Sequence, residues 1–116
     1  MIKIRINDYS NVVALVQKWG AKRGITKPEN VKTQTVKLME EVGELSEGIN
    51  KVGGNREYLD QIKDSVGDIQ VVLIILCKQL GVDYEQCLYD AYDVIKDRKG
   101  KTTEDGSFVK QEDLDK

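Results

Sequence analysis

Residues 38–45 read Leu-Met-Glu-Glu-Val-Gly-Glu-Leu. The rest of the chain is organised around this stretch, which places three carboxylates and a glycine on a helical apolar pattern. Side chains three or four residues apart share a face of a helix. Glu41 and Glu44 therefore point the same way, as do Glu40 and Glu44. Apolar residues recur beside them at helical spacing: Leu38, Val42, Leu45 and Ile49. The acids thus lie at the edge of a face that the sequence predicts to be buried.

Residues 64–69, Asp-Ser-Val-Gly-Asp-Ile, repeat this chemistry on a second predicted helix. Asp64 and Asp68 are one turn apart, and their apolar neighbours again follow helical spacing: Val66, Ile69, Leu73 and Leu76. Like charges at this spacing destabilise a helix unless a cation neutralises them. Mg²⁺ binds carboxylate oxygens in octahedral geometry, so a divalent cation between the two helices is one interpretation.

A solvated acidic face is the ordinary interpretation of one such cluster. Two glycines argue against it here, because Gly43 and Gly67 each stand one position before the last acid of their cluster. A glycine inside a helix costs about 1 kcal/mol relative to alanine. We expect both glycines to allow a close approach of the two helices, which would bring the acidic rows to one ion.

Composition excludes several classes of function. The chain has 116 residues, a net charge of −2 and no histidine. The length predicts one domain, and the charge gives no basic footprint for a nucleic-acid polymer. Without histidine there is no histidine acid–base catalysis, no His-ligated zinc and no Ser-His-Asp triad.

Nothing in the sequence predicts a membrane protein. Residues 1–6 are too short for a signal peptide, and the longest apolar run, Val71 to Cys77, is far shorter than a membrane span. Cys77 and Cys87 lie within apolar helical patterns, so we interpret both as reduced core residues. We therefore expect a cytoplasmic protein.

The apolar pattern predicts an all-α fold of four helices, with the third most deeply buried. We expect helices from Asn7 or Asp8 to Lys22, from Pro28 to about Lys51, from Asn55 to Leu80 and from Asp83 to Lys99, with Gly53-Gly54 as a break. Leu88, Ala91, Tyr92 and Ile95 would form the inner face of the fourth helix. We expect a domain over residues 1–100 and a C-terminal extended arm or hairpin over residues 101–116, with Asp105-Gly106 as a hairpin-type turn signal.

The motif Glu40-Glu41-x-x-Glu44, followed by Gly67-Asp68, resembles the MazG-like all-α nucleoside triphosphate pyrophosphohydrolases, a family that includes the dimeric dUTPases and dCTPases. The resemblance runs from about Val12 to Arg98. It implies a four-helix MazG-like bundle that assembles as a homodimer or homotetramer, holds Mg²⁺ (or Mn²⁺) between helices, and cleaves a nucleoside triphosphate to a monophosphate and pyrophosphate. Glu41, Glu44 and Asp68 match the metal ligands.

Position 65 departs from the family pattern, which usually has a glutamate three residues before the final aspartate. Ser65 stands there instead. Either Asp64, one turn before Asp68, supplies the missing ligand, or the site is weaker. We expect Asp64 to complete the metal site.

Other residues have candidate roles in the implied reaction. Glu40 is the candidate general base. Lys96 and Arg98, near the end of the fourth helix, are candidate phosphate contacts, although basic residues there also simply stabilise the helix dipole. Lys37, one turn before Glu41, fits either role. Trp19 is either a core residue or a stacking surface for a planar ligand.

Two other classes of function remain open. One is a catalytically silent module of the same fold that binds nucleotide or metal, and the other is a helical adaptor with solvated acids. We also expect a homo-oligomer whose interface includes the third or fourth helix, because apolar residues such as Ile74 and Ile75 exceed what one inner face can cover.

Overall fold

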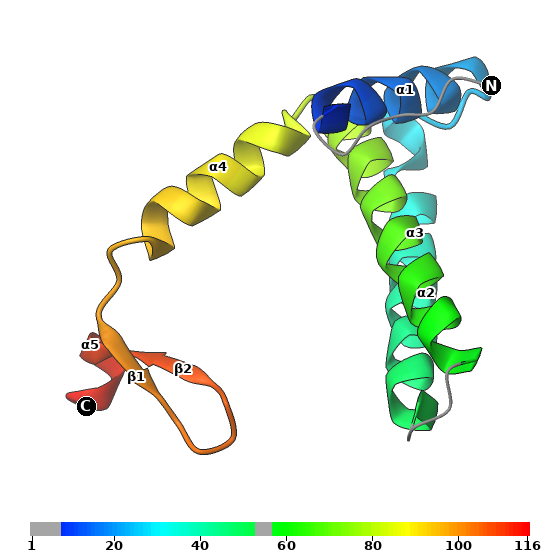
Figure 1. Cartoon of the computed structure of the whole chain (residues 1–116). Coiled ribbons are helices and arrows are strands. Elements are labelled where there is room, and N and C mark those ends of the chain that lie inside the picture. Colours follow the sequence, from blue (N-terminus) through cyan, green and yellow to red (C-terminus); the bar gives the residue numbers. More distant parts are fainter. Residues whose placement is uncertain (1–7, 53–56) are drawn as a thin grey trace. The chain divides into compact units, whose positions relative to one another are not determined.

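The computed structural model describes residues 8–52 and 57–116, and these are mostly helical. The elements follow the order α1 (Tyr9–Lys22), the 3-10 turn η2 (Pro28–Asn30), α2 (Val31–Val52), α3 (Glu57–Leu80), α4 (Tyr84–Ile95), β1 (Gly100–Thr102), β2 (Phe108–Lys110) and α5 (Gln111–Leu114) (Figure 1). The predicted all-α class is confirmed. The helix start expected at Asn7 and the break expected at Gly53-Gly54 lie outside the described residues.

The chain divides into two compact units, residues 1–84 and residues 85–116. The first contains α1, α2 and α3. Here α2 and α3 lie side by side, and α1 packs on α3 (Figure 1). The sequence predicted a boundary at residue 100 instead, and that domain assignment stays a prediction.

The core of the first unit lies mainly on α3, as the apolar pattern predicted. Val72, Ile74 and Ile75 of α3 are buried together with Val13 of α1. Ile74 and Ile75 therefore belong to the core of the subunit, and our expectation that they are left over for an oligomer interface is wrong. Gly20 of α1 lets Ile75 pack closely, since a Cβ at Gly20 would collide with the end of that side chain.

The connection between α1 and α2 is held by Gln79 of α3. Its amide nitrogen donates hydrogen bonds to the carbonyl oxygens of Ile25, at 3.0 Å, and Lys27, at 3.2 Å. Gly24 has a positive φ of 69°, which few other residues adopt, and it ends α1. Pro28 then opens η2, where its missing N–H costs nothing.

The close approach of α2 and α3 occurs at Gly48. A Cβ at Gly48 would lie 3.1 Å from Ile62 Cγ1 on α3, whereas a Cβ at Gly43 or Gly67 would meet nothing within 4 Å. Our expectation for Gly43 and Gly67 is therefore wrong. Neither glycine lies at the close contact of α2 with α3.

The second unit contains most of α4, the hairpin and α5. Strand β1 pairs antiparallel with β2, with Lys101 opposite Val109. No residue of α4 is buried. Leu88, Tyr92 and Ile95, which we expected on an inner face, are exposed, because this unit is too small to cover them. In the first unit α1 and α2 both pack on α3, and a bundle that includes α4 stays a prediction.

Neither cysteine is in a disulfide bond, and Cys77 is half-buried while Cys87 is exposed. Cys87 is therefore not a core residue, since it lies on α4. Taken singly, none of the described helices has the length and hydrophobicity needed to cross a lipid bilayer.

Candidate metal centre

The first acidic motif lies on α2, and its central residue is Glu41. Glu41 is only 5% exposed, and its Oε1 lies 3.3 Å from the Nζ of Lys37. Its Oε2 is buried and has no hydrogen-bond partner within the described residues. Lys37 Nζ also lies 3.9 Å from Glu40 Oε2, and the Glu40 side chain is exposed. A buried carboxylate with one unpaired oxygen is costly unless a cation completes it.

Lys37 is the cation that neutralises this cluster in the described structure. Its hydrogen bond to Glu41 and the Coulomb attraction of the same carboxylate raise the pKa of the Lys37 ammonium, with smaller contributions from Glu40 and Glu44. The Lys37 side chain is 53% exposed, so water screens the pair. Lys37 and Glu40 also line a shallow hollow of about 320 Å³ with Thr33 and Val36.

The second motif lies on α3 and divides between two faces of the helix. Ser65 is 2% exposed. Asp64 and Asp68 are exposed and line a groove of about 530 Å³ between α3 and α1. The serine that replaces the usual glutamate is therefore the buried member of the motif, and both aspartates border the groove.

Gln61 of α3 links the two helices at their close contact. The side-chain amide of Gln61 on α3 donates a hydrogen bond of 3.2 Å to the carbonyl oxygen of Glu44 on α2. A Cβ at Gly48 would lie 3.6 Å from Gln61 Cγ, so Gln61 lies beside Gly48 and its amide reaches to Glu44, one turn earlier on α2.

The predicted ligands do not converge in the described conformation. Among residues 8–52 and 57–116, no three acidic or cysteine side chains lie close enough together to hold one metal ion. Glu41 points into the interface with Lys37 beside it, whereas Glu44 is exposed and the two aspartates border the α1 groove. The assignment of Glu41, Glu44, Asp64 and Asp68 as metal ligands stays a prediction.

Trp19 is neither a core residue nor part of the groove. Its side chain is 44% exposed, and the guanidinium carbon of Arg23 lies 4.4 Å from the centre of its ring. The core interpretation is therefore wrong. Arg23, which follows the last residue of α1, is the planar group that stacks on Trp19, and the proposed stacking on a ligand stays a prediction.

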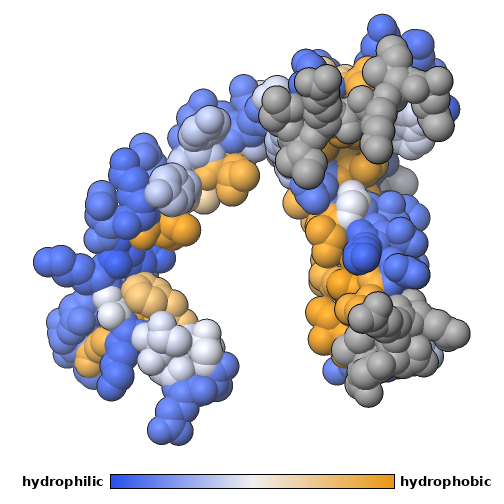
Figure 2. All heavy atoms as spheres, in the orientation of Figure 1, coloured by the Kyte–Doolittle hydropathy of each residue, from blue (hydrophilic) through white to orange (hydrophobic). Residues whose placement is uncertain are grey.

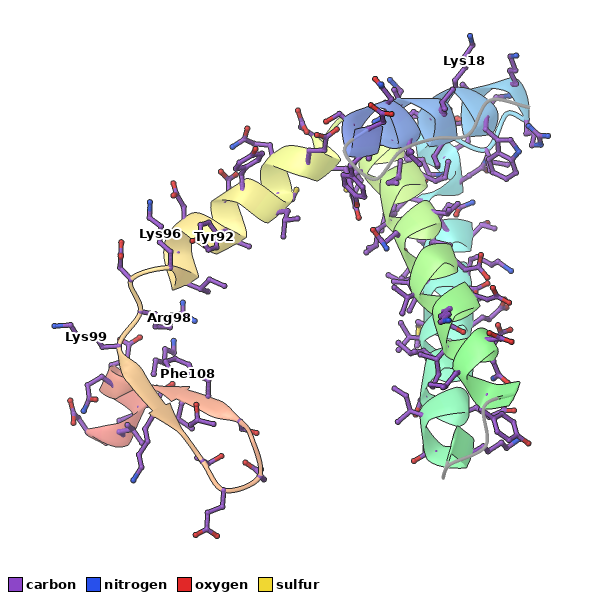
Figure 3. All side chains as sticks on the ribbon, in the orientation of Figure 1. Lys18, Tyr92, Lys96, Arg98, Lys99 and Phe108 are labelled. Carbon is purple, nitrogen blue, oxygen red and sulfur yellow. The ribbon has the colours of Figure 1, made fainter. Side chains whose placement is uncertain are left out.

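The basic residues near the end of α4 belong to the second unit. Lys96 Nζ forms an ion pair of 3.0 Å with Asp93 one turn earlier. Arg98 and Lys99 leave the chain on opposite sides (Figure 3). The phosphate contacts proposed for Lys96 and Arg98 stay predictions.

The sequence did not single out Tyr9 and Gln70, which both line the α1–α3 groove. The hydroxyl of Tyr9 lies 2.7 Å from Gln70 Oε1 and 3.2 Å from the hydroxyl of Tyr84. One feature of the sequence could have identified Gln70 as a candidate site residue. Gln70 is an uncharged polar residue inside the apolar segment from Ile69 to Cys77.

Comparison with known protein families identifies the family of this chain. Residues 29–102 match the family model of the MazG nucleotide pyrophosphohydrolase domain. The chain belongs to this family. The resemblance drawn from the two acidic motifs is thereby confirmed. The match begins just before α2, so α1 and its side of the groove lie outside the matched part of the MazG domain.

A curated relative comes from Haemophilus phage HP1 (strain HP1c1) and is described as an uncharacterized 18.2 kDa protein in the rep-hol intergenic region. It is 38% identical to this MazG domain over 76 residues, which is 66% of this chain and 44% of the phage protein. The chain thus spans less than half the length of that relative. No solved structure matches the chain.

Proposed function

We propose that this MazG domain is a Mg²⁺-dependent nucleoside triphosphate pyrophosphohydrolase, which cleaves a (d)NTP to a (d)NMP and pyrophosphate. The observation that carries the proposal is Glu41, a buried carboxylate with an unpaired oxygen on the helix that bears the family motif. A domain that only presents a solvated acidic face has no need to bury one of its carboxylates.

The residues present fit a divalent cation. Carboxylate oxygens are its preferred ligands, and Glu41 has one such oxygen without a partner. Glu41 and Glu44 from α2 would hold the ion with Asp68 and Asp64 from α3, after the exposed carboxylates change rotamer. Lys37 would then leave Glu41, because its charge is no longer needed there. Bound Mg²⁺ supplies positive charge that offsets the triphosphate and favours deprotonation of water.

Side chains of this domain would accept the proton of the attacking water and contact the phosphates. Glu40 is exposed beside Glu41 and would accept the proton of the attacking water. Lys37, released from Glu41, is within reach of the same region and would contact a phosphate oxygen as a point charge. Lys96 and Arg98 would be further phosphate contacts. Water would attack the α-phosphorus, the bond between that phosphorus and the α–β bridging oxygen would break, and pyrophosphate would leave.

We also propose that the domain works as a homo-oligomer. Apolar side chains are exposed on both helices of the α2–α3 pair, and hydrophobic residues gather along one side of it in Figure 2. We call these residues the apolar stripe: Met39, Val42 and Ile49 of α2, with Leu59, Val66 and Leu80 of α3. Contiguous apolar surface of this kind commonly marks a protein interface.

Release of pyrophosphate tests the function. The purified protein is incubated with each common NTP and dNTP, with Mg²⁺ and with a chelator. Mg²⁺-dependent pyrophosphate from at least one substrate is expected. A silent binding module would release none but would gain thermal stability with nucleotide or Mg²⁺, since ligands stabilise the native state that binds them. A helical adaptor would show neither effect.

A further inference from the structure

The α1–α3 groove is a candidate subsite that the metal chemistry does not use fully. Its volume of about 530 Å³ lies within the range of small-molecule sites. One wall is apolar and is formed by Val12, Val13 and Val16 of α1 with Val71 and Ile74 of α3. The polar side chains of Lys63, Asp64, Asp68 and Gln70 line the same groove, so its charged groups carry a net negative charge. An apolar wall with a few polar groups suits a flat heterocycle better than it suits a phosphate.

Hydrogen bonding fixes the orientation of Gln70. The Tyr9 hydroxyl has one hydrogen, and it donates this hydrogen to Gln70 Oε1 at 2.7 Å. The contact of 3.2 Å between Tyr9 and Tyr84 can then form only if Tyr84 is the donor. Burial and this hydrogen bond raise the pKa of Tyr84, which agrees with a hydroxyl that keeps its proton and donates it. The chain of donors thus runs from Tyr84 through Tyr9 to Gln70.

A carboxamide held by its oxygen presents N–H donors. Gln70 Oε1 accepts from Tyr9, so the side chain offers its two amide hydrogens to a ligand. Uracil, thymine and guanine carry a carbonyl oxygen where cytosine and adenine carry an amino group. The N–H donor of Gln70 can form a hydrogen bond with this carbonyl oxygen. It cannot form one with the amino group, because both groups are donors.

We propose that the groove holds the nucleoside part of the substrate and that Gln70, oriented by Tyr9, favours bases with a carbonyl oxygen over cytosine and adenine. This inference rests on the proposed function for the identity of the ligand. Asp64 and Asp68 on the same groove would place the sugar and phosphates toward the acidic motifs. Gln70 and Tyr9 are then specificity residues and take no part in the chemical step.

Binding of reaction products tests the inference apart from turnover. Affinities of UMP and CMP are measured by calorimetry, because these nucleotides differ at the carbonyl or amino position. The wild-type protein is expected to bind UMP about tenfold more tightly, in line with one good discriminating contact. Equal affinities, a preference for CMP or no binding of either nucleotide would overturn the proposal.

Substitutions then assign the preference to residues. Tyr9→Phe removes the donor that orients Gln70, so the UMP/CMP ratio is expected to fall toward one while UMP still binds. Gln70→Glu offers only acceptors and is expected to reverse the ratio. Tyr89→Phe, on an exposed tyrosine of α4, is the matched control and is expected to keep the wild-type ratio. Circular dichroism checks that each variant folds. An unchanged ratio in folded Tyr9→Phe and Gln70→Glu would remove both residues from the site.

The two proposals fail separately. A UMP/CMP ratio that depends on Gln70, without pyrophosphate release from any triphosphate, would leave the groove assignment standing and overturn the catalytic function. Mg²⁺-dependent pyrophosphate release with equal affinity for UMP and CMP would leave the function standing and overturn the specificity role of Gln70.

Discussion

Lys37 Nζ lies 3.3 Å from Glu41 Oε1, and the other oxygen of Glu41 is buried without a partner. The exposed Lys37 ammonium thus pairs with one oxygen of the buried Glu41 carboxylate and leaves the other oxygen without a partner. A cation that binds the second oxygen would remove the cost of this unpaired charge. This relationship leads to the first prediction.

Glu41→Gln is expected to abolish pyrophosphate release and to remove any Mg²⁺-dependent rise in melting temperature. The helical circular dichroism signal should persist, because the amide fills nearly the same volume. Glu47→Gln is the matched control, since Glu47 lies on the same helix and forms an exposed 2.8 Å pair with Lys51. Wild-type activity in Glu41→Gln would contradict the assignment of Glu41 as a metal ligand.

Ser65→Glu places the usual family residue at a buried position on α3. Without Mg²⁺ the variant is expected to lose roughly 1–3 kcal/mol of unfolding free energy, because a second carboxylate is buried there. With Mg²⁺ it should gain more thermal stability than the wild type. Differential scanning fluorimetry over a Mg²⁺ titration measures both effects. A Mg²⁺ response equal to that of the wild type would show that position 65 does not face the ion.

Asp64→Asn decides whether Asp64 compensates for Ser65. If Asp64 is a ligand, the variant needs more Mg²⁺ for half-maximal activity, and Asp64→Asn combined with Ser65→Glu recovers part of the loss. Asp60→Asn, one turn earlier on α3 and exposed, is the matched control. Superimposable magnesium curves for the wild type and Asp64→Asn would leave Asp64 outside the site.

The apolar stripe is expected to form the oligomer interface. Val42→Asp, which places a charge in its centre, should shift the protein toward the monomer in light scattering at micromolar concentration. Leu15→Asp is the control, because Leu15 is similarly exposed but lies on α1. If the wild type is already a stable monomer, the prediction of an oligomer is wrong.

Glycines of α2 should respond differently to alanine. Gly43→Ala is expected to stabilise the domain by about 0.5–1 kcal/mol, since the Cβ meets nothing and helix propensity improves. Gly48→Ala gains the same propensity but presses on Ile62 at 3.1 Å, so it should be the less stable variant. Urea unfolding of the two variants makes the comparison. The reverse order would contradict the helix contact at Gly48.

The hairpin turn should depend on the ionisation of Asp105. Hydrogen bonds from the Thr103 hydroxyl and the Ser107 amide lower the pKa of the Asp105 carboxyl below its ordinary value of 3.8. The turn is therefore stabilised above pH 3.8, and this stabilisation is lost as the pH falls through the lower, folded pKa. The Ser107 amide shift in NMR spectra follows the transition. Asp105→Asn should abolish it, and Glu104→Gln should not.

The sequence by itself determined the helices and the family. Helical apolar spacing with terminating glycines predicted α1, α2 and the well-buried α3, and the two acidic motifs resembled the MazG family, to which the comparison assigned the chain. These features depend on neighbours within a turn or two of one helix, so they can be read from local order along the chain.

Tertiary structure decided which residues face which neighbour. The sequence assigned close helix contact to Gly43 and Gly67, but the contact is at Gly48. It also could not show that Ser65 is buried while Asp64 and Asp68 line a groove with Tyr9 and Gln70. The rotation of one helix against another depends on how side chains distant in sequence fill the space between them. Periodicity gives a helix its apolar face, and only packing selects the partner of each residue on it.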